Sequence, residues 1–205
     1  MKVLLINGSS HKNGCTNRAL EEIARTLSVE GVESEIVWTG NKITGCMACW
    51  SCKKTGRCVI DDLVNEVAEK MKSSDGLIVG TPVYYASPNG TLLSFLDRLF
   101  FSSSANMKFK PASMIASARR AGTTASLDVL SKYFSINQMP VVSSTDWNMV
   151  HGFTPEDVEK DLEGLQSMRN LARNMAWLLK SIEAGKKAGL ELPASETGEH
   201  TNFIR

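Results

Sequence analysis

Residues 2–18 read KVLLINGSSHKNGCTNR, and this stretch decides the fold. Within the strand expected at 2–7, positions 3–6 are all apolar, so both faces of the strand are apolar, as in a strand buried on both faces of a parallel sheet. A run rich in Gly, Ser and Asn follows. From 16 to 30 the apolar residues recur every three or four positions, as on one face of a helix. The succession of strand, loop and helix therefore predicts an alternating α/β architecture.

The same alternation continues along the chain. Further strands are expected at 33–38, 76–81, 112–118 and 139–143, and further helices at 61–72, 89–101, 123–134 and 155 to about 182. Five strands alternating with helices predict an open five-stranded parallel sheet with helices on both faces. Thr154, Pro155 and Asp157 supply the cap, first position and acidic first turn of the last helix.

The chain divides into one domain and a C-terminal segment. With 205 residues it suits a single domain, for which we predict the bounds 1–183. Residues 184–205 are rich in Gly, Ser, Thr and Glu without periodicity and are expected to form an extended arm or tail. The long last helix exceeds what one small sheet needs, so we expect part of it to contact another subunit in a homodimer or homotetramer.

Composition excludes several classes of partner. The 23 Lys and Arg nearly balance the 22 Asp and Glu, so no electrostatic footprint for nucleic acid or an anionic membrane is present. No apolar run approaches the roughly 20 residues of a bilayer span. Met1 leads directly into a strand-like run, so we expect a cytoplasmic protein without a secretory leader.

The loop at 7–18 has the composition of a phosphate cradle. Hydroxyls at Ser9, Ser10 and Thr16 and the amide of Asn17 stand where a helix N-terminus presents free backbone N–H groups. The loop lacks the glycine patterns of dinucleotide and nucleoside-triphosphate sites. It therefore predicts a ligand with a terminal phosphate, although an ordinary loop with a helix cap is the alternative.

Two further loops are expected at the same edge of the sheet, because each follows a strand of a parallel sheet at its carboxyl end. The segment 81–88 reads TPVYYASP, and 118–123 reads ARRAGT. Tyr84 and Tyr85 supply aromatic surface and the two prolines stiffen the segment, so a flat, partly polar ring would fit there. Core packing of the tyrosines is the alternative.

A cysteine run stands out from the otherwise ordinary composition. Four of the five cysteines, all but Cys15, lie in the loop 45–58 with spacing C-x2-C-x2-C-x5-C: Cys46, Cys49, Cys52 and Cys58. Three short intervals are the compact wrapping that an iron–sulfur cluster uses, whereas zinc sites more often separate two pairs. A 4Fe–4S cluster is favoured. Because the loop follows the second strand, we expect it at the same carboxyl edge of the sheet as the three loops above. Zinc and free cysteines are the alternatives.

These features resemble the flavodoxin-like NADPH-dependent FMN reductases and, among them, the iron–sulfur flavoproteins. The resemblance rests on the strand, loop and helix at 6–17, the segment TPVYY from Thr81, the Leu-Asp-Arg at 96–98 and the cysteine run. It implies a strand order of 2-1-3-4-5. It also implies FMN, with the phosphate and ring held by these residues: Ser9, His11, Thr16 and Asn17 at the phosphate; Pro82, Val83, Tyr84, Tyr85 and Ser87 along the ring; Arg119, Gly122 and Thr123 at its pyrimidine end.

The function expected from the resemblance is that of an FMN-dependent oxidoreductase. NAD(P)H or reduced ferredoxin would supply electrons, which would pass through FMN and a 4Fe–4S cluster to a quinone, flavin or protein acceptor. No hydrolytic triad or carboxylate pair is present, so we expect no catalytic side chain and chemistry that comes from the cofactor. Asp97 and Arg98 are expected to serve as an ion pair or structural anchor. A non-enzymatic electron carrier or redox sensor is the alternative.

Overall fold

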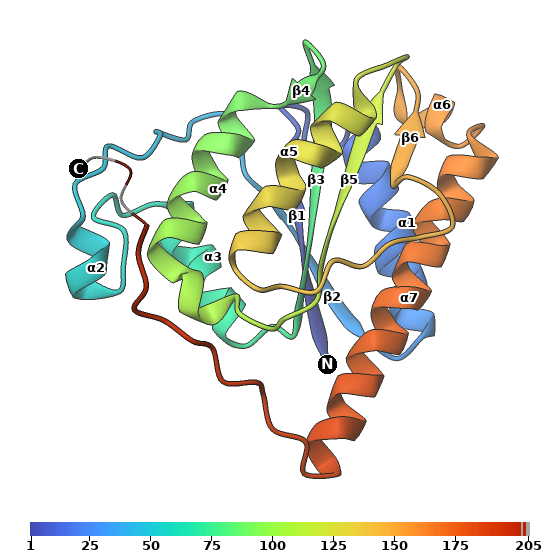
Figure 1. Ribbon diagram of the computed structural model, residues 1–205. Coiled ribbons are helices and arrows are strands. Elements are labelled where there is room, and N and C mark those ends of the chain that lie inside the picture. The colour runs from blue at the N-terminus through green and yellow to red at the C-terminus, as the bar shows by residue number, and fades with distance from the viewer. Residues whose placement is uncertain (202, 204–205) are drawn as a thin grey trace.

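A twisted parallel sheet forms the centre of the protein. The computed structural model describes residues 1–201 and 203. Neighbouring strands run in the order β2-β1-β3-β5-β6, and each pair on this path is parallel (Figure 1). The strands are β1 (Lys2–Asn7), β2 (Glu33–Trp38), β3 (Gly76–Tyr84), β5 (Ala112–Ala118) and β6 (Met149–His151), with a short β4 (Ser87–Pro88) folded back antiparallel on the end of β3. The predicted α/β class and the order of its parallel strands are confirmed.

Helices cover both faces of the sheet (Figure 1). On one face lie α1 (Cys15–Val29) and α7 (Leu162–Lys187); on the other lie α3 (Leu63–Lys72), α4 (Gly90–Ser103) and α5 (Thr123–Ile136). The strand β1 serves both cores, because Val3 and Leu5 pack toward α1 and α7 while Leu4 and Ile6 pack toward the opposite helices. No helix in the described part of the chain combines the length and apolar composition that a membrane crossing requires.

The expected strand at 139–143 is wrong. In that segment only Val141 makes an isolated bridge, to Ala112. Pro140 has no N–H to donate, and the segment bonds the backbone of the neighbouring strand only through the carbonyl of Pro140 and the N–H of Val142. The chain then leaves the sheet at Ser143.

The fifth parallel strand is instead β6, which pairs with the carboxyl end of β5. Asn148 fixes the point of return: its side chain donates to Ser113 Oγ at 3.1 Å and its carbonyl accepts from Ala116 N at 2.9 Å. The last strand of the sheet is therefore divided, with an excursion at 143–148 between its two parts.

The C-terminal helical region is also divided. A short α6 (Pro155–Val158) begins with Thr154 as its N-cap, as expected, and Asp157 accepts from Thr154 N at 3.2 Å in a capping box. The helix α7 begins after a break at which Asp161 caps Gly164 N at 2.9 Å. The helix α7 continues to Lys187, past the predicted boundary at 183, and residues 188–201 follow without regular structure. The domain boundary stays a prediction, and residues 202, 204 and 205 of the predicted tail lie outside the described residues.

Candidate functional site

The N-terminus of α1 points at the carboxyl edge of the sheet without a side-chain cap. Gly14 precedes the helix, and no side-chain hydrogen bond caps it. Within the described chain, the backbone N–H groups of Cys15, Thr16 and Asn17 have no acceptor, and the first helical bond is made by Arg18 N. Free N–H groups at the positive end of a helix dipole form a site for an anion.

Two buried asparagines fix the loop between β1 and α1. The Asn7 side chain donates to Lys12 O at 2.9 Å and accepts from Ser9 N at 3.0 Å. Asn89, which also caps α4, donates to Gly8 O at 2.9 Å from 81 residues away. These positioning residues were not among those predicted, because nothing in the local sequence shows which carbonyls they meet.

The structure places the predicted phosphate residues together but gives their side chains internal roles. Thr16 is buried and its hydroxyl lies 2.7 Å from Ser117 Oγ, while Ser9 Oγ accepts from His11 N at 3.1 Å. Asn17 donates to Glu21 at 2.7 Å. His11 is exposed at the mouth of the loop. An anion here would therefore be held mainly by backbone N–H groups.

The segment 82–88 forms a hairpin that projects from the carboxyl edge (Figure 1). Its turn residues, Tyr85 and Ala86, have positive φ angles of 50° and 56°. Residues other than glycine adopt this left-handed conformation only at a cost in conformational free energy. Tyr84 is 42% exposed and Tyr85 is fully exposed, so neither tyrosine packs in the core. Both rings are available to a ligand.

The loop after β5 packs directly on this hairpin. Gly122 has a φ of 92°, and a Cβ atom at this position would lie 2.7 Å from Ala86 Cα and 2.8 Å from Val83 Cγ1. Arg119 is exposed, whereas Thr123 is buried and donates to Met149 Sδ at 3.2 Å. The three predicted loops thus meet at one edge of the sheet, and only the absence of a side chain at Gly122 allows the contact.

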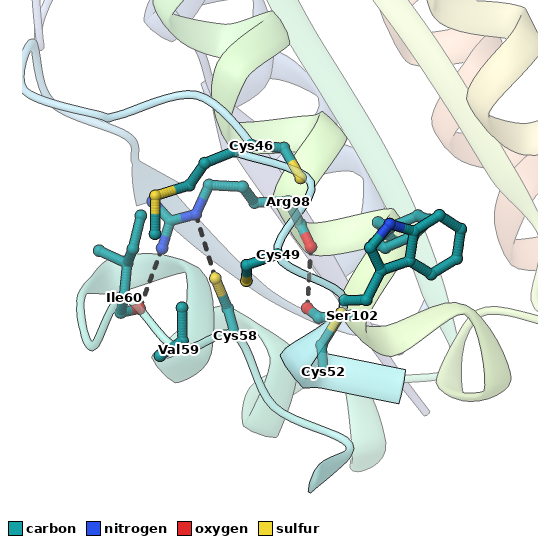
Figure 2. Close-up of a pocket in the computed structure, with 11 residues that line it drawn as sticks. Cys46, Cys49, Cys52, Cys58, Val59, Ile60, Arg98 and Ser102 are labelled. Atoms are coloured by element: carbon teal, nitrogen blue, oxygen red, sulfur yellow. Dashed lines mark hydrogen bonds between the residues drawn. The ribbon is translucent and has the colours of Figure 1, made fainter. Parts of the chain in front are cut away.

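The four clustered cysteines line one pocket, which we call the cysteine pocket (Figure 2). Its wall is otherwise mostly apolar: Met47, Trp50, Val59, Ile60, Arg98, Phe101 and Ser102. The cysteines are free thiols, and Cys46 and Cys49 are exposed. Among the described residues, no three His, Cys, Asp or Glu side chains are arranged to hold a single metal ion.

The backbone of the cysteine loop is wound tightly. Each of its two C-x2-C intervals contains one residue in the left-handed region: Ala48 at a φ of 50° and Trp50 at 60°. Left-handed conformations of residues other than glycine are costly and gather at ligand-binding segments. The short helix α2 (Ser51–Thr55) then carries Cys52, and the indole of Trp50 stacks edge-on against Phe101.

Arg98 of α4 closes the inner wall of the cysteine pocket (Figure 2). It is 2% exposed, and its Nε donates to Cys58 Sγ at 3.3 Å. Its two terminal nitrogens bond Asp62 at 2.7 and 2.8 Å. Burial alone would lower the pKa of Arg98, but the hydrogen bonds to Asp62 and to Cys58 raise it above its usual value. The guanidinium is therefore charged.

The expectation that Arg98 serves as a structural anchor is confirmed, but its partner is Asp62 and not Asp97. Asp97 instead accepts from the hydroxyl of Tyr133. Asp62 also caps α3 through Val64 N at 3.1 Å, so one carboxylate fixes a helix start and the buried cation together.

The cysteine pocket lies beside α4 and not at the strand ends, where the sequence placed it. Arg98 and Phe101 stand eight and eleven positions after the first residue of α4, which is about 12–17 Å along the helix from the carboxyl edge. The loop reaches this depth because Arg98 binds the carbonyls of Thr44 and Ile60 on both sides of it.

The fold of this protein is similar to that of several solved structures. Solved structures similar to this one include an archaeal flavodoxin, with a TM-score of 0.60 and 16% identity over 88% of this chain and 99% of that chain. Another is RosB with bound 8-demethyl-8-formylriboflavin-5'-phosphate, with a TM-score of 0.68 and 14% identity over 100% and 92% of the two chains. At these identities the likeness shows the fold, which is flavodoxin-like as expected.

Comparison of sequences defines the class as flavoprotein oxidoreductase. Residues 1–154 match the family model described as NADPH-dependent FMN reductase. The chain belongs to this family. It is 32% identical over 192 residues to an iron–sulfur flavoprotein of Methanocaldococcus jannaschii, covering 89% of this chain and all of that one. It is 27% identical over 191 residues to an iron–sulfur flavoprotein of Methanosarcina thermophila, covering 91% and 99% of the two chains. The expected family and the expected enzyme class are confirmed.

Proposed function

We propose that this protein passes electrons from NAD(P)H or reduced ferredoxin, through FMN and a 4Fe–4S cluster on its four clustered cysteines, to a quinone, flavin or protein acceptor. The observation that carries the proposal is the presence of two sites in one domain, the uncapped α1 N-terminus among three loops and the cysteine pocket. The names of the similar iron–sulfur flavoproteins support the same pairing.

The residues at the carboxyl edge fit FMN. Three N–H groups without acceptors, beginning at Cys15, suit the terminal phosphate and do not depend on the net charge of the protein. Tyr84 and Tyr85 would flank the ring with their exposed aromatic faces, and Arg119 would meet its polar pyrimidine end. Gly122 keeps the two ring-binding loops together.

The residues of the cysteine pocket fit an iron–sulfur cluster. Four thiols from one loop face one apolar pocket, and the left-handed residues in both intervals wind the loop around it. Lys53, whose Nζ lies 4.4 Å from the Phe101 ring centroid, and the neighbouring Lys54 offset part of the charge of four thiolates. When bound, FMN supplies hydride and single-electron exchange and the cluster supplies single-electron exchange.

The protein residues then bind and orient these groups rather than react covalently. The loop held by Asn7 and Asn89 fixes the anion end of the ligand, and the hairpin with the loop at Gly122 fixes the other end. Four reduced thiols suit a reducing compartment, so we propose a cytoplasmic location.

An anaerobic visible spectrum with iron and acid-labile sulfide assays tests the proposal. We expect flavin peaks over a broad cluster absorbance in the wild type. Cys49→Ser should lose the broad absorbance and keep the flavin peaks, while Cys15→Ser, outside the cysteine pocket, should keep both. A colourless protein that takes up no FMN on reconstitution refutes the proposal. Zinc in place of iron and sulfide refutes the cluster alone.

Steady-state assays separate an enzyme from an electron carrier. Sustained NAD(P)H or ferredoxin oxidation with a quinone or flavin acceptor supports the enzyme. Rapid one-electron exchange with a ferredoxin, without turnover of any acceptor, supports the carrier.

We also propose a homodimer or homotetramer. Leu162 and Trp177 on α7 are 74% and 69% exposed, which is unusual for large apolar side chains on a helix that covers a sheet. Light scattering on the holoprotein tests this, and a monomer at micromolar concentration refutes it.

A further inference from the structure

Every N–H of the Arg98 guanidinium is committed to a partner. A guanidinium has five N–H donors. Four of them meet oxygen: two the carboxylate of Asp62, one Thr44 O at 3.2 Å and one Ile60 O at 3.0 Å. The fifth, on Nε, meets the sulfur of Cys58. A side chain held at all five donors has no freedom to turn away, so the contact with sulfur is fixed by the fold.

Cys58 is fixed through its backbone as well. Asn65 of α3 is 4% exposed; its Oδ1 accepts from Cys58 N at 3.1 Å and its Nδ2 donates to Cys58 O at 3.0 Å. Cys46 and Cys49 are exposed and lie in the strained part of the loop. Cys58 is therefore the one thiol of the four whose sulfur and backbone are both held by buried side chains of the sheet-covering helices.

We propose that Arg98 is a positioning residue that holds the sulfur of Cys58 as the fixed corner of the iron–sulfur site and raises the reduction potential of the bound cluster. The inference rests on the proposed function, since it needs a cluster on the four cysteines. One-electron reduction adds one negative charge to the site. A buried cation and an N–H directed at a ligand sulfur stabilise that added charge.

The Nε–H of Arg98, which points at the sulfur of Cys58, affects the cluster potential more than the rest of the guanidinium does. Asp62 offsets much of the guanidinium charge at longer range, whereas the Nε–H is in contact with the sulfur itself. The cations of the loop act less, because Arg57 has 59% side-chain exposure and pairs with the exposed Asp61, so water and salt screen it.

A potentiometric titration with dithionite as the reductant measures the effect on anaerobically reconstituted holoprotein. Arg98→Gln should make reduction of the cluster at least tenfold less favourable, a potential lower by about 59 mV for a one-electron couple. Arg98→Lys keeps the charge but loses the Nε donor, and its potential should fall between those of the wild type and Arg98→Gln. Arg57→Gln removes the same charge from the exposed loop and should change the equilibrium by no more than about twofold. Release of iron to a chelator, followed in the same samples, should be faster in both Arg98 variants.

Each outcome decides between the two levels of the proposal. A wild type that binds no iron and sulfide overturns the cluster and this inference together. If the wild type binds a cluster and both Arg98 variants have the same cluster potential as the wild type, the inference alone is overturned. If neither variant folds, pulsed EPR of the reduced wild type labelled with ¹⁵N-arginine replaces them: a coupled arginine nitrogen supports the inference, and its absence overturns it.

Discussion

Replacing Gly122 with alanine tests whether the contact between two loops builds the flavin site. The new Cβ would stand 2.7 Å from a backbone atom of Ala86 and 2.8 Å from Val83 Cγ1, and the residue would keep a φ of 92°. The left-handed conformation costs about 1–2 kcal/mol and overpacking about 1–3 kcal/mol more, so we expect the free energy of unfolding to fall by about 2–5 kcal/mol. The hairpin must move to relieve the clash, and FMN binding would require it to move back. If that return restores about 1.4 kcal/mol of strain, FMN affinity should fall about tenfold.

Gly31→Ala is the matched control. Gly31 has a φ of 75°, no atom lies within 4 Å of its Cβ position, and it stands in the turn before β2 at the opposite edge of the sheet. It should lose only the conformational part, about 1–2 kcal/mol, and bind FMN as the wild type does. Guanidinium unfolding without FMN, followed by circular dichroism, gives the stabilities, and quenching of FMN fluorescence gives the affinities. Equal losses of stability in the two variants, or unchanged FMN affinity in Gly122→Ala, would refute the reasoning.

Three further substitutions give distinct outcomes. In Glu22, burial would raise the pKa, but hydrogen bonds from Arg169 and Arg18 lower it below its usual value, so its contribution to stability is present above the usual pKa of a glutamate and is lost as the pH falls through the lowered one. Glu22→Gln should therefore lose about 3 kcal/mol near neutral pH, and urea unfolding should show the difference shrinking in acid; a pH-independent difference would contradict this. Asn65→Ala leaves buried loop groups unpaired and should lose about 1–3 kcal/mol in the same assay; a loss below this range would show that the loop is held without it. Ala86→Gly removes the strain of a positive φ of 56° and should raise the free energy of unfolding by up to about 1 kcal/mol. A lower free energy of unfolding in this variant would show that the turn is unstrained.

Most of the fold was predictable because local patterns and tertiary structure agree. The four residues 3–6 are all apolar, and the strand that contains them is buried on both faces of the sheet. The first four predicted helices begin and end within two residues of the observed bounds, since capping residues and apolar periodicity are local signals. The last was predicted as one helix from 155 to about 182, whereas the structure divides it into α6 and α7.

The end of the sheet was not predictable in the same way. The run at 139–143 has the composition of a strand, but the pairing that forms β6 depends on where Asn148 meets β5. A three-residue strand has too few positions to show any periodicity. Its place is set by tertiary hydrogen bonds alone.

The site was predictable in its residue types and less so in its contacts. The glycines, hydroxyls and cysteines indicated which loops form the candidate site. The contacts of Asn89 with the first loop and of Arg98 with Cys58 join residues 81 and 40 positions apart, and no local pattern records such pairs. The depth of the cysteine pocket followed from the same long-range contacts, which explains why the sequence placed it too near the strand ends.

The divided last strand affects how the sheet meets its surroundings. An unpaired strand edge is a template on which a strand of another chain can add. Here β6 is only three residues long, and at the opposite edge Glu35 of β2 accepts hydrogen bonds from Lys2 and Lys70 at 2.6 and 2.5 Å. The short edge strand β6 and the charged edge strand β2 both disfavour aggregation by strand addition. The helical faces are then the surfaces through which copies of the protein can associate.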